Sequence, residues 1–473
     1  MKKLTFLLLF FVGTFSAIGQ ADNSTEARLA RIENNLAPLF QIKGREVPKY
    51  NIDERLKELG IPGISVAFVK DGKIAWARAY GMADVADGKK MTTETLLLAG
   101  SISKPVAALR AHQMVEDGTF SLDENVNSYL KSWQVPDNEF TQEEKVTLRR
   151  ILNHTAGLTV WGFPGYDKGD KVPSTVEVLD GKGNTDSVRV YKVPGESWMY
   201  SGGGYTIMQL MIEDNESVSF TESLQKNVLD KMNMRGSTFG NPLPEKYHDL
   251  AATGYRGDGR EVEGKWPIYP EMAAAGLWTT PSQLIQYAIE VQKINNTQQD
   301  GILKYETVKE MLTPGMNSHG LGPVVKRHYF EHGGADEGFR AQLFAWKEQP
   351  YALVTMVNSD NGSIQQELAL AIAEEYGLKG IRPTVYNTID MAAADMEKFT
   401  GKFNIPDLGD CEFTIENGQL QVSAAFLPKT LKLLPMTETR FFDEADGTPF
   451  AFDIKDGKVV GFNVQRFRGN RVD

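Results

Sequence analysis

A serine followed three residues later by a lysine occurs at three places in the chain: Ser101/Lys104, Ser128/Lys131 and Ser223/Lys226. Serine is a weak nucleophile that needs a base within hydrogen-bond reach. Ser101 follows the apolar run Leu96–Ala99 and precedes Pro105, which predicts the first turn of a helix. Residues three apart share a helix face, so Lys104 is expected beside the Ser101 hydroxyl. Ser101 is therefore the candidate nucleophile, with a simple helix cap as the alternative.

Two further segments carry groups that suit the same chemistry. Tyr200 stands just before the glycine run Gly202–Gly204, and a nearby cation would favour its phenolate as a base. Glu331–Ala335 reads as an edge strand opposite the serine, where glycines let a substrate backbone approach and the Ala335 N–H face a carbonyl oxygen. The alternatives are a packing tyrosine and a hydrogen-bonded loop histidine at position 332.

These three segments, in this order, resemble the serine β-lactamase and penicillin-binding-protein superfamily, in particular its class C-like branch of β-lactamases, esterases and D-aminopeptidases. The resemblance covers roughly Ile52–Leu378 and includes Gly60–Gly63, Leu152–Leu158 and Ala274–Pro281. It implies that Ser101 is the nucleophile, Lys104 its proton partner and Tyr200 the general base. It also implies that the Ser101 and Ala335 amides form the oxyanion hole. Which of Lys104 and Tyr200 takes the first proton stays open.

The sequence departs from the β-lactamase pattern at two places. Gly202 stands where those enzymes carry an asparagine, and His332-Gly333-Gly334 replaces a lysine-led triad. The resemblance places these four residues at the substrate. Both changes remove polar contacts to a β-lactam, which puts efficient antibiotic hydrolysis in doubt. Arg340 could restore a carboxylate contact by bidentate pairing, or it could form a surface ion pair.

The first residues predict export. Lys2 and Lys3 precede an apolar run, Leu4–Val12, and small residues near position 19 suit cleavage before Gln20. We expect residues 1–19 to be a signal peptide and the mature protein to be periplasmic or extracellular without a stable membrane anchor. An uncleaved N-terminal anchor is the alternative. The single cysteine, Cys411, cannot form an internal disulfide.

The remaining pattern predicts an α/β (α+β) fold in two parts. Residues 20–385 alternate strands, such as 64–69, 73–80 and 352–357, with helices from Lys104 and from Ile364, which suits a central antiparallel sheet flanked by helices plus an all-helical subregion. Residues 386–473 are short alternating runs with hairpin dipeptides at Asn417-Gly418, Asp446-Gly447 and Asp456-Gly457. This part resembles a small lipocalin-like β-barrel.

The composition limits the classes of binding partner and cofactor that we expect. A net charge of −11 disfavours nucleic acid, and the six histidines show no metal-binding spacing, so we expect neither a metal nor another cofactor. The predicted partner is a small-molecule or short-peptide substrate, and no oligomeric state is predicted. The prediction is an acyl-enzyme hydrolase for a peptide, amide or ester, including D-amino-acid peptides or cell-wall fragments. The alternatives are a β-lactamase proper and a non-catalytic penicillin-binding-like protein.

Overall fold

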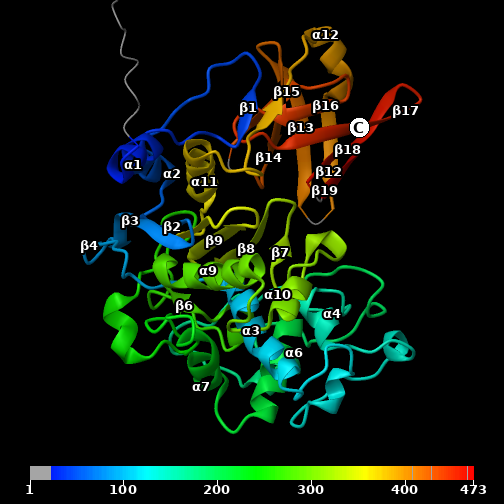
Figure 1. Cartoon of the computed structure of the whole chain (residues 1–473). Coiled ribbons are helices and arrows are strands. Elements are labelled where there is room, and N and C mark those ends of the chain that lie inside the picture. The colour runs from blue at the N-terminus through cyan, green and yellow to red at the C-terminus, as the bar shows by residue number, and fades with distance from the viewer. Residues whose placement is uncertain (1–22, 407, 428, 466, 473) are drawn as a thin grey trace, which may run out of the picture.

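The computed structural model describes residues 23–472 except 407, 428 and 466 (Figure 1). The predicted signal peptide, residues 1–19, lies outside the described residues. No helix of the described chain is long and apolar enough to cross a bilayer.

The centre of the molecule is an antiparallel sheet of seven strands. In sheet order they are β4 (Lys89–Lys90), β3 (Lys73–Asp84), β2 (Gly63–Lys70), β10 (Ala352–Val357), β9 (Phe339–Trp346), β8 (Tyr329–Asp336) and β7 (Val324–Val325). The turn Asp71-Gly72 joins β2 to β3. The strand predictions for 64–69, 73–80 and 352–357 are confirmed, with longer ends on the first two.

Both faces of the sheet are covered, which explains why its central strands are apolar throughout. Ile64, Val66 and Phe68 of β2 pack into one core, while Ala67 and Val69 pack into the other, as the two-residue period of a strand requires. The first core contains α1 (Thr25–Glu33), α2 (Ile52–Leu59) and α11 (Ser363–Tyr376). The second contains α9 (Pro281–Thr297) and the helical region.

The helical region lies below the sheet in Figure 1. Its helices are α3 (Ser103–Glu116), α4 (Leu148–Leu152), α5 (Thr175–Leu179), α6 (Gly202–Asn215), α7 (Phe220–Leu224), α8 (Met272–Ala275) and α10 (Tyr305–Met311). A short ladder between β5 (Leu97–Leu98) and β6 (Trp278–Thr279) ties the start of α3 to the segment after α8. The turn that contains Ser101 is therefore anchored by β5 on one side and by α3 on the other.

The C-terminal barrel is a closed ring of eight antiparallel strands. They are β12 (Gly401–Ile405), β13 (Gly409–Glu416), β14 (Gln419–Ala424), β15 (Leu431–Pro435), β16 (Arg440–Asp443), β17 (Pro449–Lys455), β18 (Lys458–Val464) and β19 (Phe467–Arg471). Each predicted hairpin dipeptide lies between two consecutive strands of this ring. The predicted fold class, a mixed helix-and-sheet domain followed by a small barrel, is confirmed.

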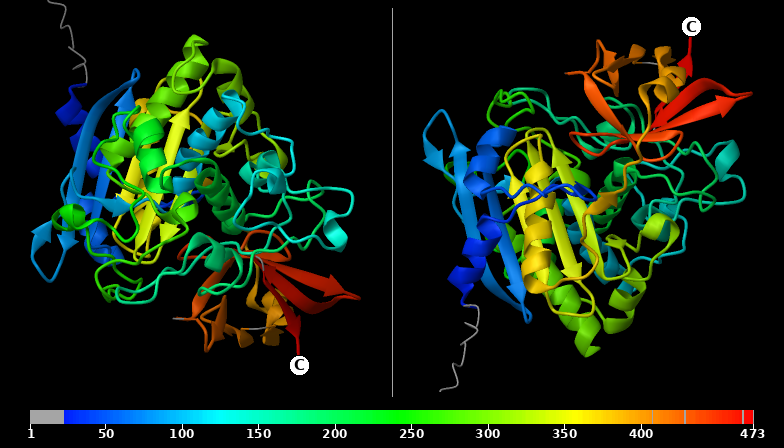
Figure 2. Two further views of the ribbon diagram at one scale, coloured as in Figure 1. Left: turned by 90° about the horizontal axis from the view of Figure 1, so that it is seen from below. Right: turned by 90° about the horizontal axis from the view of Figure 1, so that it is seen from above.

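The barrel lies to one side of the sheet domain (Figure 2). Strand β1 (Phe40–Ile42) pairs in parallel with β11 (Thr384–Tyr386), just before the short helix α12 (Ala393–Met396). The Tyr386 ring lies 4.6 Å from that of Phe442 in the barrel, and Arg45 pairs with Glu444 at 2.6 Å. The predicted domain boundary after residue 385 falls inside β11 and stays a prediction.

Candidate active site

Ser101 lies in a 3₁₀ turn, η1 (Gly100–Ile102), that leads directly into α3. The Lys104 ammonium donates to the Ser101 hydroxyl at 3.0 Å and to the Ala274 carbonyl at 2.8 Å. Lys104 is only 2% exposed, so its ammonium is fixed by these bonds rather than by solvent. The Ser103 hydroxyl accepts from the Leu277 amide at 2.9 Å and anchors the helix start. The local geometry expected from the three-residue spacing is present.

The other two serine–lysine pairs lie in different settings. The Ser128 hydroxyl donates to Glu124, and the Lys131 ammonium donates to the Asp214 carbonyl. Ser223 is buried and accepts from Arg110 at 3.3 Å. Neither serine bonds its lysine in the described structure, so the spacing alone does not create a Ser–Lys contact.

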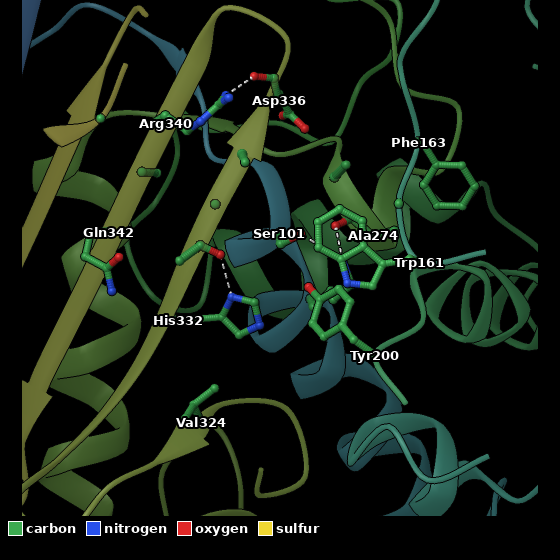
Figure 3. A pocket seen from close by; sticks show the side chains of 18 of the residues that line it. Ser101, Trp161, Phe163, Tyr200, Ala274, Val324, His332, Asp336, Arg340 and Gln342 are labelled. Atoms are coloured by element: carbon green, nitrogen blue, oxygen red, sulfur yellow. Dashed lines mark hydrogen bonds between the residues drawn. The ribbon is translucent and has the colours of Figure 1, made fainter. Parts of the chain in front are cut away.

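Tyr200 comes just before α6, and its side chain lies close to Ser101 in the cavity (Figure 3). The Lys104 ammonium lies 5.0 Å from the centre of the Tyr200 ring, and the centre of the tilted His154 ring lies 4.2 Å from it. His154 accepts from the Ser201 amide at 3.2 Å and so fixes the backbone beside Tyr200. Burial and the charges of neighbouring groups hold the pKa of His154 well below its ordinary value. The imidazole beside Tyr200 is therefore neutral.

The serine turn packs against β8 through two glycines. Gly100 has a left-handed backbone with φ of +54°, and a Cβ there would lie 2.5 Å from the Ala335 nitrogen. A Cβ on Gly334 would overlap the Ala99 carbonyl. Backbone can meet backbone at this point because neither residue has a side chain. The Ala335 amide is thereby brought next to the Ser101 segment.

The His332 ring presents a lone pair and not a proton to the cavity. Its Nδ1 lies 2.7 Å from the Gly333 carbonyl, which can only accept, so Nδ1 carries the proton. Its Nε2 is buried without a hydrogen-bond partner among the described residues. Burial and the Lys104 charge lower the pKa of His332 to about 3. The third motif thus supplies a neutral acceptor.

An open cavity of about 810 Å³ connects these groups. Its lining includes these predicted site residues: Ser101, Lys104, Tyr200, His332, Gly333, Gly334, Ala335 and Arg340. Elements far apart in the sequence, from η1 to β9, therefore converge on one site.

Comparison with known proteins agrees with this geometry. The family model described as Beta-lactamase matches residues 49–376. The chain belongs to the beta-lactamase family. It is 22% identical to penicillin-binding protein 4* of Bacillus subtilis (strain 168), over 84% of this chain and 91% of that protein. It is 23% identical to protein flp of Staphylococcus aureus (strain N315), over 75% and 69%.

Two solved structures share the fold. The octameric penicillin-binding protein homologue from Pyrococcus abyssi has a TM-score of 0.62 at 23% identity, covering 88% of this chain and 97% of that one. SurE with D-Leu has a TM-score of 0.56 at 21% identity, covering 89% and 97%. Membership of the beta-lactamase family supports serine-hydrolase activity in general.

Gly202 is placed differently from the other predicted site residues. It is buried at the start of α6 and lies outside the described lining of the cavity. The position of its missing Cβ lies 2.9 Å from Cε2 of Phe163 and 3.2 Å from the Trp161 carbonyl. Aromatic and backbone atoms therefore fill the space in which an asparagine would stand.

Arg340 lines the cavity but already has partners. Its guanidinium donates to the carbonyls of Asp336 and Phe339 at 2.6 and 2.7 Å and pairs with Asp360 at 3.1 Å. Contact with a substrate carboxylate would compete with these bonds.

The expectation that the His332 segment is an edge strand is partly wrong. Strand β7 pairs outside β8, at Val324↔Glu331 and Val325↔Phe330. The partner strand is two residues long. Residues 332–336 of β8 lie beyond the end of this partner strand, and they line the cavity without pairing to it.

Sequence reasoning missed several residues that line the cavity. Trp198 and His319 had no sequence signal, and the aromatic residues Trp161 and Phe163 also line it. Asp336 could have been found, because it shares the two-residue period of His332 and Gly334 on β8.

Proposed function

We propose that the protein is an exported serine hydrolase that forms an acyl-enzyme on Ser101, with Lys104 and Tyr200 as proton-transfer groups. The observation that carries the proposal is the 3.0 Å bond between the Lys104 ammonium and the Ser101 hydroxyl at the wall of an open cavity. A serine held by a base in a substrate-sized cavity is the arrangement that acyl transfer needs.

In the first half of the reaction, the Ser101 oxygen attacks the substrate carbonyl carbon, and its proton passes to whichever of Lys104 and Tyr200 is in its basic form, a neutral amine or a phenolate. The amides of Ser101 and Ala335 stabilise the charge that develops on the carbonyl oxygen. The bond from carbon to the leaving nitrogen or oxygen then breaks, and the leaving group takes the proton. In the second half, water gives a proton to the same base, its oxygen attacks the acyl carbon, and Ser101 recovers its hydrogen as the acid leaves.

The cavity supports amide or ester substrates of small molecules or short peptides. The third motif offers a neutral histidine where a lysine would bind a β-lactam carboxylate, and Phe163 fills the space beside Gly202. SurE, whose fold the chain shares, was solved with D-Leu, which makes D-amino-acid derivatives the first substrates to test. Export is proposed from Lys2, Lys3 and the apolar run after them.

Labelling with a fluorescent fluorophosphonate tests the nucleophile. We expect the wild-type protein to be labelled and Ser101→Ala to lose labelling by at least about 10³-fold, since removing the nucleophile of such a site costs that much or more. Ser128→Ala, from another serine–lysine pair, is the matched control and should label like wild type. Equal labelling of Ser101→Ala would refute the assignment. Rapid turnover of nitrocefin would instead identify a β-lactamase proper.

A further inference from the structure

Asp336 is a buried carboxyl group at the cavity with an unused oxygen. Its side chain is 5% exposed and lines the cavity, and its Oδ2 has no hydrogen-bond partner among the described residues. A buried carboxylate without a partner costs free energy, so such a group marks a place where a ligand could supply one.

Its position relative to the nucleophile is fixed by the strand. His332, Gly334 and Asp336 alternate along β8 and are its buried face. Gly334 is where the serine turn meets the strand, so the two side chains lie on either side of Ser101 (Figure 3). When a substrate carbonyl binds at Ser101, the substrate groups next to that carbonyl would lie near His332 or near Asp336.

Two cationic side chains act on Asp336, but neither bonds its Oδ2 among the described residues. The Lys104 ammonium donates to Ser101 and to the Ala274 carbonyl, and Arg340 is paired with Asp360. A second buried carboxyl, Glu271, also acts on Asp336, and neither of its oxygens has a partner among the described residues. Asp336 Oδ2 is therefore left for a donor that the substrate supplies.

We infer that Asp336 binds an ammonium group of the substrate next to the scissile carbonyl, so that the site selects aminoacyl amides or esters with a free amine. The inference rests on the proposed function of Ser101 and names the substrate class for it. Asp336 acts as a specificity determinant, because it would pair with the substrate through a charge-assisted hydrogen bond.

Burial raises the pKa of Asp336 to about 8, against the opposing effects of Lys104, Arg340 and the Gly100 amide and with a further upward effect from Glu271. Tyr269 also lies within electrostatic reach of Asp336. An ammonium beside the carboxyl would favour its ionised form and lower this pKa.

The test compares D-alanine p-nitroanilide with its N-acetyl counterpart, which lacks the positive charge. We expect wild type to have the higher kcat/KM on the free amine, and Asp336→Asn to lower the ratio of the two values by at least about tenfold. Glu331→Gln, a carboxyl on the other face of the same strand, is the matched control and should keep the wild-type ratio.

The outcomes separate this inference from the proposed function. Fluorophosphonate labelling of Asp336→Asn reports whether Ser101 is still assembled. If Asp336→Asn is labelled but its ratio of kcat/KM values is unchanged, the inference alone is overturned. A preference of the wild-type protein for the N-acetyl or an N-succinyl substrate would also overturn it, and this measurement needs no variant. Loss of the Ser101 assignment would instead appear as hydrolysis and labelling that survive Ser101→Ala.

Discussion

The cavity around Ser101 and the interior of the C-terminal barrel bury different kinds of side chain. Among the described residues, the buried side-chain nitrogen and oxygen atoms without partners all lie between Ser65 and Asn358, and several line or border the cavity. The barrel core is a cluster of aromatic and aliphatic groups, with Phe413 within 5.2 Å of Phe403 and Phe462. Unpartnered polar atoms cost stability, whereas packed rings supply it. The first region suits binding and the second suits stability.

Among the variants that test this comparison, Gly334→Ala should have the largest effect, and it acts on the reactivity of the cavity. A Cβ at Gly334 would overlap the Ala99 carbonyl, so the strand must move away from the serine turn and from the Ala335 amide. Loss of one such donor costs about 10²–10³-fold in rate, and we expect fluorophosphonate labelling to slow by about that factor. Gly333→Ala is the control, because its Cβ would meet only the end of the Gln342 side chain at 3.3 Å. Equal labelling of both variants would contradict the proposed contact.

Phe413→Ala tests the barrel side. This ring is 1% exposed and lies 5.1 Å from Phe452, so its removal leaves a cavity in the barrel core. Truncation of a buried phenylalanine costs about 3–5 kcal/mol. We expect thermal or denaturant unfolding of the barrel to shift by that amount, while labelling of Ser101 by the folded protein stays within about twofold of wild type because the sites are distant. A large loss of labelling would show that the barrel supports the site.

Asp336→Asn should have the smallest effect of the three variants, and it acts on the pH dependence of the free energy of unfolding. Burial raises the pKa of Asp336 from 3.8 to about 8, so between these values the folded state holds a proton that the unfolded state has released. The free energy of unfolding therefore loses a contribution as pH rises through this window. Without the carboxyl, the variant should gain on the order of 2 kcal/mol over wild type between pH 5 and pH 8.

Denaturant unfolding at several pH values measures this gain. The histidines act in the opposite direction, since burial lowers the pKa of His332 to about 3 and of His319 to about 4, but they are the same in both proteins. A stability difference that stays constant with pH would mean that the pKa of Asp336 is the same in the folded and unfolded states.

The sequence determined the features that depend on neighbours along the chain. The Ser101/Lys104 contact follows from a one-turn spacing together with its place at a helix start, the strands 64–69 and 352–357 from their apolar runs, and the hairpins from dipeptides such as Asn417-Gly418. Helical and hairpin geometry fix these relations locally, so they can be derived from spacing.

The tertiary structure alone decided which groups share the cavity and how each is paired. Lys104 of α3 and Tyr200 of the segment before α6 are brought together from distant parts of the chain, and Phe163 occupies the space beside Gly202. The proton position on His332 and the unused oxygen of Asp336 depend on burial and on partners from distant segments. Burial and pairing are set by long-range packing, which residue type and spacing do not specify.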